Sequence, residues 1–203
     1  LGAALLLFLA AALVIAVTPG PGIFYVAARS RAAGRAEGIA SSIGTGIGGM
    51  VHVVAGAIGV SALVLASAEA FTLLKLAGAI YLIWLGIRTW RDAGRAPDLT
   101  LPARAGWRRA LREGVVVEAL NPKTAAFFLA FVPHFVDPAQ GGVAAQFALL
   151  GLLSVTLNTA VDVVVAFGAA ALRDRMTGRP GVVRRLRQAS GATLCALGAA
   201  LAM

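Results

Sequence analysis

Long apolar stretches dominate the chain, and short segments rich in arginine, glycine or proline separate them. A bilayer core about 30 Å thick is crossed by roughly 20 residues of helix, and six stretches reach or approach that length. None shows the apolar–polar alternation of a membrane-embedded strand. The pattern therefore predicts an all-α membrane protein with six transmembrane helices, which are Ala3–Ala28, Ile39–Ala66, Ala70–Trp90, Gly114–Val136, Ala145–Leu172 and Gln188–Met203.

Composition excludes an ordinary soluble domain. Hydrophobic residues make up 59% of the 203 residues and charged residues 13%, with a mean hydropathy of +0.85. Soluble domains are about half apolar and a quarter charged, and a chain of this size cannot hide so much apolar surface from water. The first stretch does not resemble a secretory signal peptide, because no basic residue precedes its apolar run and no small-residue cleavage site follows it.

Charge placement orients the predicted bundle. The net charge is +9, and every arginine lies in the last turn of, or after, the first, third or fifth predicted span. The loops after the second and fourth spans carry acidic residues and no arginine. The positive-inside rule then predicts cytoplasmic arginine-bearing loops and both termini outside. A nucleic-acid-binding patch is the alternative, but the alternation with the spans already accounts for the arginines.

Two polar, proline-bearing interruptions stand about half the chain apart, at Thr18–Gly22 and Asn121–Lys123. Each half holds three spans, so a tandem copy enters the membrane in the opposite direction, as in many secondary transporters. We therefore expect two inverted three-helix repeats, residues 1–90 and 114–203, with the first and fourth helices broken. The basic segment 91–113 is the predicted cytoplasmic linker between them.

The interruptions are also the predicted binding site. Proline removes a backbone hydrogen bond, and in lipid the freed carbonyl groups need protein, water or ligand as partners. A helix that restarts after the break offers N–H groups that suit a carboxylate. The alternative is that the prolines only bend the helices. The predicted substrate-binding residues are Thr18, Pro19, Gly20, Pro21, Asn121, Pro122, Lys123 and Asn158.

Charged residues inside the spans are the next candidates. A lysine within a span costs about 3 kcal/mol, so Lys123 should bind a substrate carboxylate or pair with Asp162 or Glu118, unless it reaches back to the cytoplasmic surface. Asp162 is the first candidate for a proton-coupling group, with a structural salt bridge as the alternative. Glu118 is either a second coupling group or a solvated helix end. His52 is a possible proton relay, although a hydrogen bond across helices is favoured for it.

Other chemistry is disfavoured. The single cysteine, Cys195, excludes an internal disulfide or a CxxC site, and two scattered histidines do not suggest a metal cluster. No HExxH motif or serine–histidine pattern suggests an enzyme, so we expect neither catalysis nor a cofactor. The glycines at 44 and 48 have GxxxG spacing, which favours packing within the monomer and leaves a homodimer as the second possibility.

Three segments together resemble the LysE/RhtB family of amino-acid exporters, and the likeness covers nearly the whole chain. They are Thr18-Pro19-Gly20-Pro21, the stretch Gly78–Gly86, and Asn121-Pro122-Lys123 followed by Phe127-Phe128 and Pro133-His134-Phe135.

The resemblance implies a multi-pass permease of the bacterial inner membrane that exports amino acids or their derivatives by proton antiport. It also implies that Asp162 matches an acidic position of the fifth span. One lysine and one clear acid inside the spans favour a neutral substrate such as threonine, homoserine or leucine. Export of lysine or arginine is the alternative, and metal-ion efflux or a non-transporting scaffold is disfavoured.

Overall fold

The computed structural model describes residues 2–94, 106–171 and 180–202, and every regular element in these ranges is helical. The first half contains α1 (Gly2–Val17), α2 (Pro21–Ala33), α3 (Arg35–Ala66), α4 (Ala68–Arg91) and the short η1 (Asp92–Gly94). The second half contains α5 (Trp107–Ala119), α6 (Pro122–Ala126), η2 (Phe127–Phe131), η3 (Val132–Phe135), η4 (Pro138–Gln140), α7 (Val143–Ala171) and α8 (Pro180–Ala202).

Both predicted helix breaks are present. Helices α1 and α2 meet at a bend of 48°, and α5 meets the helical segment that begins with α6 at a bend of 43°. Each bent pair is long and apolar enough to count as one membrane span, as are α3, α4 and α7 individually. Five of the six predicted spans are thus supported by length and hydropathy. Helix α8 has 23 residues, but arginines in its first turns lower its apolar character.

Helix ends differ from the predicted span ends. Helix α5 begins at Trp107, so the last seven residues of the predicted linker are helical, and α8 begins at Pro180 instead of Gln188. Hydropathy locates only the part of a helix that lies in the lipid core. The backbone hydrogen bonds of the helix continue into the polar interface, so the helix is longer than the apolar stretch. Leu172, Met203 and much of the predicted linker lie outside the described residues.

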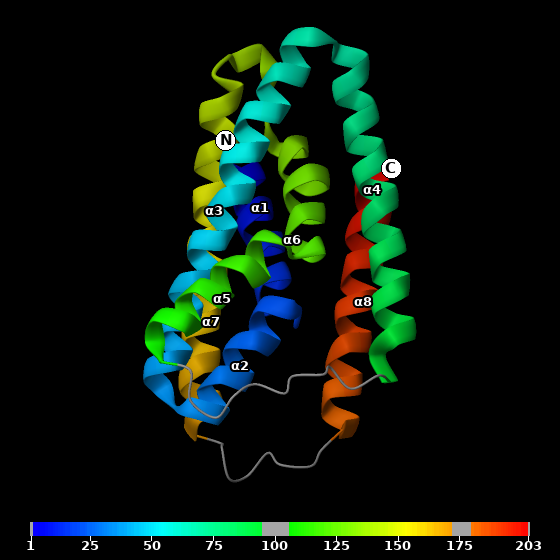
Figure 1. Cartoon of the computed structure of the whole chain (residues 1–203). Coiled ribbons are helices and arrows are strands. Elements are labelled where there is room, and N and C mark those ends of the chain that lie inside the picture. The colour runs from blue at the N-terminus through cyan, green and yellow to red at the C-terminus, as the bar shows by residue number, and fades with distance from the viewer. Residues whose placement is uncertain (1, 95–105, 172–179, 203) are drawn as a thin grey trace.

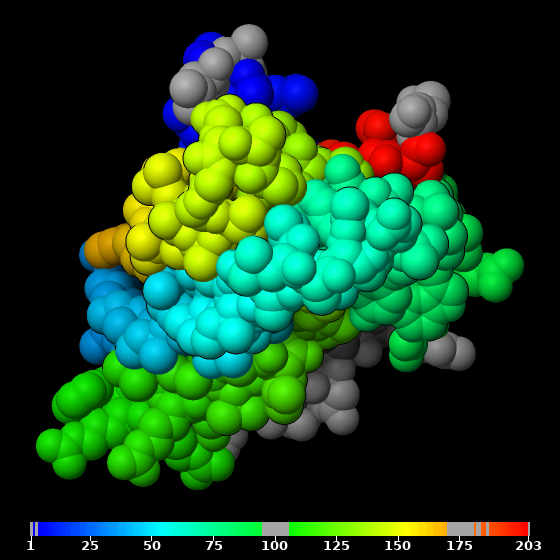
Figure 2. All heavy atoms as spheres, turned by 90° about the horizontal axis from the view of Figure 1, so that it is seen from above, coloured from blue at the N-terminus to red at the C-terminus, as the bar shows by residue number. Residues whose placement is uncertain are grey.

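Counted with each bent pair as one span, successive spans run in opposite directions, so that corresponding spans of the two halves are antiparallel (Figure 1). The ends of α2, α4 and α7 and the starts of α5 and α8 gather at one end of the bundle. The arginines of the described residues belong to the turns nearest this end, which we call the arginine end. The α3–α4 junction, η4 and both chain termini lie toward the other end, which is viewed directly in Figure 2.

Glycines bring the long helices into close contact. A Cβ atom on Gly44 or Gly48 of α3 would lie 2.2 or 2.5 Å from a carbonyl oxygen of α5. The GxxxG pair therefore packs within the chain, as favoured from the sequence. Helix α4 packs along α8, where a Cβ on Gly86 or on Gly191 would lie 2.6 Å from the other glycine's carbonyl oxygen. These contacts set the two halves directly against each other.

Candidate functional site

The first break leaves helix ends that its own side chains do not cap fully. Thr18 turns its hydroxyl back to the Val14 carbonyl oxygen, at 2.6 Å. The residue before α2 is Gly20, which has no side chain to cap the helix start. The Pro19 carbonyl oxygen accepts a hydrogen bond from Ser190 of α8, at 3.0 Å. This junction thus depends on residues from elsewhere in the chain.

Lys123 of α6 caps the carboxyl end of α1. Its ammonium donates hydrogen bonds to the carbonyl oxygens of Ile15 and Thr18, at 3.1 and 2.7 Å, and only 7% of the residue is exposed. A cation is stabilised there because the end of a helix carries partial negative charge. Within the described residues Lys123 forms no direct ion pair, so its pairing with Asp162 or Glu118 is limited to interaction at longer range. Its burial also excludes the alternative that it reaches the surface.

Glu118 lies at the other helix end of the first break, which is the start of α2. A Cβ atom on Gly22, in the first turn of α2, would lie 2.6 Å from Glu118 Oε2. The carboxylate thus occupies the positive end of a helix dipole. It accepts hydrogen bonds from Thr124 Oγ1 at 2.6 Å and Asn121 Nδ2 at 2.9 Å. Only 3% of Glu118 is exposed, so the alternative of a solvated helix end is wrong.

A protein carboxylate, that of Glu118, therefore lies beside the helix start where the sequence predicted a substrate carboxylate. His52 lies behind it, and its Nε2 donates to the Glu118 carbonyl oxygen at 3.0 Å. This is the cross-helix hydrogen bond that the sequence favoured.

The second break, in contrast, is capped by its own residues. Asn121 precedes α6 and its Oδ1 accepts a hydrogen bond from the backbone N–H of Lys123, at 3.0 Å. Pro122 occupies the first helical position, where its missing N–H costs nothing. The same Asn121 side chain donates to Glu118, which fixes the end of α5 to the start of α6.

Asp162 of α7 is fully buried and faces α3. Thr45 Oγ1 lies 2.7 Å from its Oδ2 and 2.9 Å from the Ser42 carbonyl oxygen. The other carboxyl oxygen of Asp162, Oδ1, has no hydrogen-bond partner among the described residues. Asp162 thus makes a hydrogen bond with Thr45 and no salt bridge within the described part of the chain.

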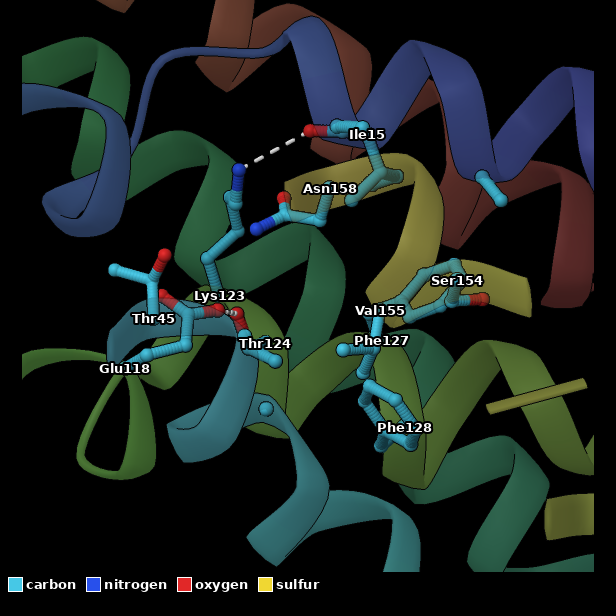
Figure 3. A pocket seen from close by; sticks show the side chains of 14 residues that line it. Ile15, Thr45, Glu118, Lys123, Thr124, Phe127, Phe128, Ser154, Val155 and Asn158 are labelled. Carbon is cyan, nitrogen blue, oxygen red and sulfur yellow. Dashed lines mark hydrogen bonds between the residues drawn. The ribbon is translucent and has the colours of Figure 1, made fainter. Parts of the chain in front are cut away.

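A small cavity of about 30 Å³ lies between the two breaks. Figure 3 shows Lys123 reaching across it toward Ile15, with Asn158 beside the lysine and Glu118, Thr45 and Thr124 grouped on one side. Phe127, Phe128 and Val155 form an apolar wall. The space suffices for a water molecule or two and is too small for an amino acid. The lining residues are Ala12, Ile15, Ala16, Thr45, Gly46, Gly49, Glu118, Lys123, Thr124, Phe127, Phe128, Ser154, Val155 and Asn158.

Comparison with known proteins assigns the chain to a family. A family model described as LysE type translocator matches residues 13–203. The chain belongs to the LysE-type translocator family.

Two of the relatives match almost the whole translocator, and a third matches nearly three quarters of it. It is 35% identical to an uncharacterized membrane protein of Vibrio cholerae, over 97% of this chain and 95% of the relative. It is 33% identical to the homoserine/homoserine lactone efflux protein of Salmonella typhimurium, over 96% and 94%. It is 31% identical to the leucine efflux protein of Klebsiella pneumoniae, over 72% and 70%. No solved structure matches the chain.

The translocator's cavity brings together some predicted residues and leaves others behind its wall. Lys123, Asn158 and Glu118 line it directly, whereas Asp162 reaches it only through Thr45 and His52 only through Glu118. The segment Thr18–Pro21 contributes one of the two carbonyl oxygens that Lys123 binds, that of Thr18. The sequence missed Thr45, Thr124 and Ser154, although a hydroxyl residue between the closely spaced glycines of α3 was a usable signal for Thr45.

Proposed function

We propose that this translocator exports a small neutral amino acid from the cytoplasm across the bacterial inner membrane, in exchange for protons. The efflux of homoserine and of leucine is named for two of its relatives, which supports a neutral substrate. The site residues proposed are those around the cavity between the breaks.

The observation that carries the proposal is the pair of opposite charges on the cavity wall. Lys123 and Glu118 both line the cavity, and their formal charges cancel. Lys123 uses two ammonium protons on the α1 carbonyl groups, and among the described residues the third has no acceptor. A substrate carboxylate can accept this proton, while a substrate ammonium donates to Glu118 or Asn158. A zwitterion fits such a site without adding net charge to the membrane interior.

The apolar wall then receives the substrate side chain. Phe127 and Phe128 are buried and belong to the π-helical η2, directly after the segment that carries Lys123. A π-helical turn in an otherwise α-helical segment often marks a functional site. The wall offers no carboxylate beyond Glu118, which disfavours lysine or arginine as substrate.

Proton coupling is proposed for Asp162 through Thr45. A hydroxyl has one proton, yet Thr45 Oγ1 lies within hydrogen-bond distance of two acceptors, Asp162 and the Ser42 carbonyl group. An ionised Asp162 accepts the hydrogen bond from the Thr45 hydroxyl, so Thr45 then donates none to the Ser42 carbonyl group. A protonated Asp162 donates to Thr45 instead, and Thr45 then donates to Ser42. Each protonation state thus sets the orientation of a hydroxyl on the cavity wall.

The architecture proposed is two inverted repeats, residues 1–90 and 114–203, joined by the segment 91–113. The opposed directions of corresponding helices, the similar bends at the two breaks and the α4–α8 contact support it. Alternating access then follows from motion of the half-helices about the breaks. We place the arginine end in the cytoplasm and both termini outside.

Counterflow in proteoliposomes tests the substrate class. Liposomes preloaded with homoserine, threonine or leucine are expected to accumulate radiolabelled homoserine, and liposomes preloaded with arginine or lysine are not. Stronger exchange with arginine than with homoserine would contradict the proposal for neutral substrates. Empty liposomes and liposomes with the Lys123→Met variant serve as controls.

The Asp162→Asn variant tests coupling separately. It is expected to lose efflux driven by a pH gradient and to retain homoserine exchange, because exchange needs no net proton movement. The matched control is Glu69→Gln, which neutralises an exposed carboxylate outside the cavity. Gradient-driven efflux at the normal rate in Asp162→Asn would remove Asp162 from the mechanism.

A further inference from the structure

A second cluster of buried charges lies outside the cavity, around Arg29 of α2. Arg29 is 0% exposed. Its guanidinium forms an ion pair and hydrogen bond with Glu113 of α5 and lies 3.7 Å from the Glu37 carboxylate of α3. Buried arginines are rare unless paired, and this one faces two carboxylates on two other helices.

Tyr25, one turn before Arg29, extends the same contact. Its hydroxyl lies 2.9 Å from the Ala110 carbonyl oxygen and 3.1 Å from Glu113 Oε2, and it accepts from Arg29 Nε at 3.4 Å. Glu37 in turn accepts from the backbone N–H of Gly106, just before α5, at 2.9 Å. We call Tyr25, Arg29, Glu37 and Glu113 the arginine latch. It joins α2 and α3 of the first half to α5 of the second.

The latch lies on the arginine-end side of the cavity. Helix α2 runs from the first break toward the arginine end, and α5 runs from that end to the second break (Figure 1). Arg29 is nine residues beyond Gly20, which places it about 13 Å along the helix from the break. The two half-helices that the latch joins are therefore the ones that a bend at the two breaks would separate.

On the opposite side of the cavity, a contact of different chemistry joins the two halves. Phe8 of α1 packs against Phe127, Phe131 and Phe135, with ring centroids 6.3, 6.0 and 5.2 Å apart. This contact is apolar and tolerates sliding, whereas the latch depends on specific hydrogen bonds. The cavity thus lies between an ionic contact on one side and an aromatic contact on the other.

We propose that the arginine latch is the gate that closes the substrate cavity toward the arginine end, and that it opens when the site faces that side. This inference rests on the proposed transport function. Separating paired charges without water is costly, so the latch has two favourable states, one paired and dry and the other apart and hydrated. Partial opening is unfavourable. This property suits a gate that is open only while the contact on the other side of the cavity is closed.

Side-selective labelling of a cavity cysteine tests the gate without any transported substrate. The reporter is Ser154→Cys in a Cys195→Ala background, reconstituted in vesicles and exposed to a membrane-impermeant maleimide on one face at a time. Cysteines at the exposed positions Arg112 and Ala139 report which face is the arginine end. Arg29→Gln and Glu113→Gln are expected to raise labelling from the arginine end at least about tenfold and to lower labelling from the other face.

Two further variants keep the test decisive. Arg109→Gln removes an exposed partner of the same Glu113 carboxylate, which it bonds at 2.7 Å, and is expected to change either rate less than about twofold. Tyr25→Phe removes only a hydroxyl and keeps the ring, so it tests the latch with little risk to folding. It is expected to raise labelling from the arginine end by about threefold.

A gate predicts that labelling rises from the arginine end and falls from the other face. Loss of a merely structural ion pair would loosen the fold and raise labelling from both faces. Equal rises from both faces, or unchanged rates in Tyr25→Phe and Glu113→Gln, would overturn the gate. Reciprocal labelling together with failed homoserine counterflow would uphold the gate and reject the proposed substrate. Homoserine counterflow together with unchanged labelling in the variants would uphold the proposed substrate and reject the gate.

Discussion

The two breaks share prolines and similar bends, yet different residues stabilise them. At the second break Asn121 caps the new helix and bonds the end of the old one, so the junction is held mainly by its own residues. At the first break the charged groups come from the other half: Lys123 caps the end of α1 and Glu118 faces the start of α2.

This difference indicates which junction is free to change. A self-capped turn keeps its geometry when neighbouring helices move, whereas a junction held by distant side chains changes whenever they do. Lys123 and Glu118 also line the cavity, so a solute that binds them competes with the first break for the same charges. On the proposed function, we therefore expect substrate binding to be linked to the conformation of the broken helix α1–α2.

The largest effect is expected for Lys123→Met, which keeps the length of the stem and removes the ammonium. The Ile15 and Thr18 carbonyl groups then lose a charged donor, and the substrate carboxylate loses its partner. Charge-assisted hydrogen bonds contribute about 1.5–3 kcal/mol each, so homoserine counterflow should fall at least about 100-fold. Lys75→Met, at the only other lysine of the chain, is the control and should transport normally. Normal counterflow in Lys123→Met would mean that the residue that caps the first break does not bind the substrate.

A smaller loss is expected for Glu118→Gln. The amide has one acceptor oxygen in place of two, and the negative charge at the start of α2 disappears. Initial exchange rates should fall about tenfold. The comparison is Asn121→Ala, which removes the cap of the second break but keeps both charges and should cost about threefold. A larger loss in Asn121→Ala than in Glu118→Gln would reverse the proposed difference between the breaks.

The smallest effect is expected for Gly22→Ala. The added Cβ would lie 2.6 Å from Glu118 Oε2, so the carboxylate has to shift away from the helix start. Because that group is the end of a flexible side chain, the cost should be near the lower limit for overpacking, about 1 kcal/mol, seen as a lowered melting temperature. Gly59→Ala has nothing within 4 Å of the new atom and should not lower it. Equal stability of the two variants would mean that Glu118 is not held at α2.

The positions of the breaks were predictable because proline and glycine act locally. Two prolines and two glycines within Thr18–Gly22 exclude a continuous helix whatever surrounds them, and the structure has a junction there. The partners of the buried charges were not predictable in this way. Lys123 binds carbonyl groups more than 100 residues away in the chain, and backbone acceptors leave no signature in a sequence.

The latch was missed for a related reason. Arg29 is one of 16 arginines whose placement the positive-inside rule already explained, so nothing marked it as buried. Two acidic residues could have indicated the latch. Glu37 and Glu113 lie among the arginines, and the positive-inside rule gives no reason for carboxylates there. Tyr25, one turn before Arg29 on the same helix face, was the second signal.

The most direct test of a central site between the breaks is substrate protection of the Ser154→Cys reporter in the Cys195→Ala background. Homoserine at concentrations that saturate counterflow is expected to slow maleimide labelling of this cysteine several-fold, and to leave a cysteine at exposed Ala139 unaffected. Saturating homoserine that leaves the labelling rate at position 154 unchanged would contradict a substrate site in this cavity.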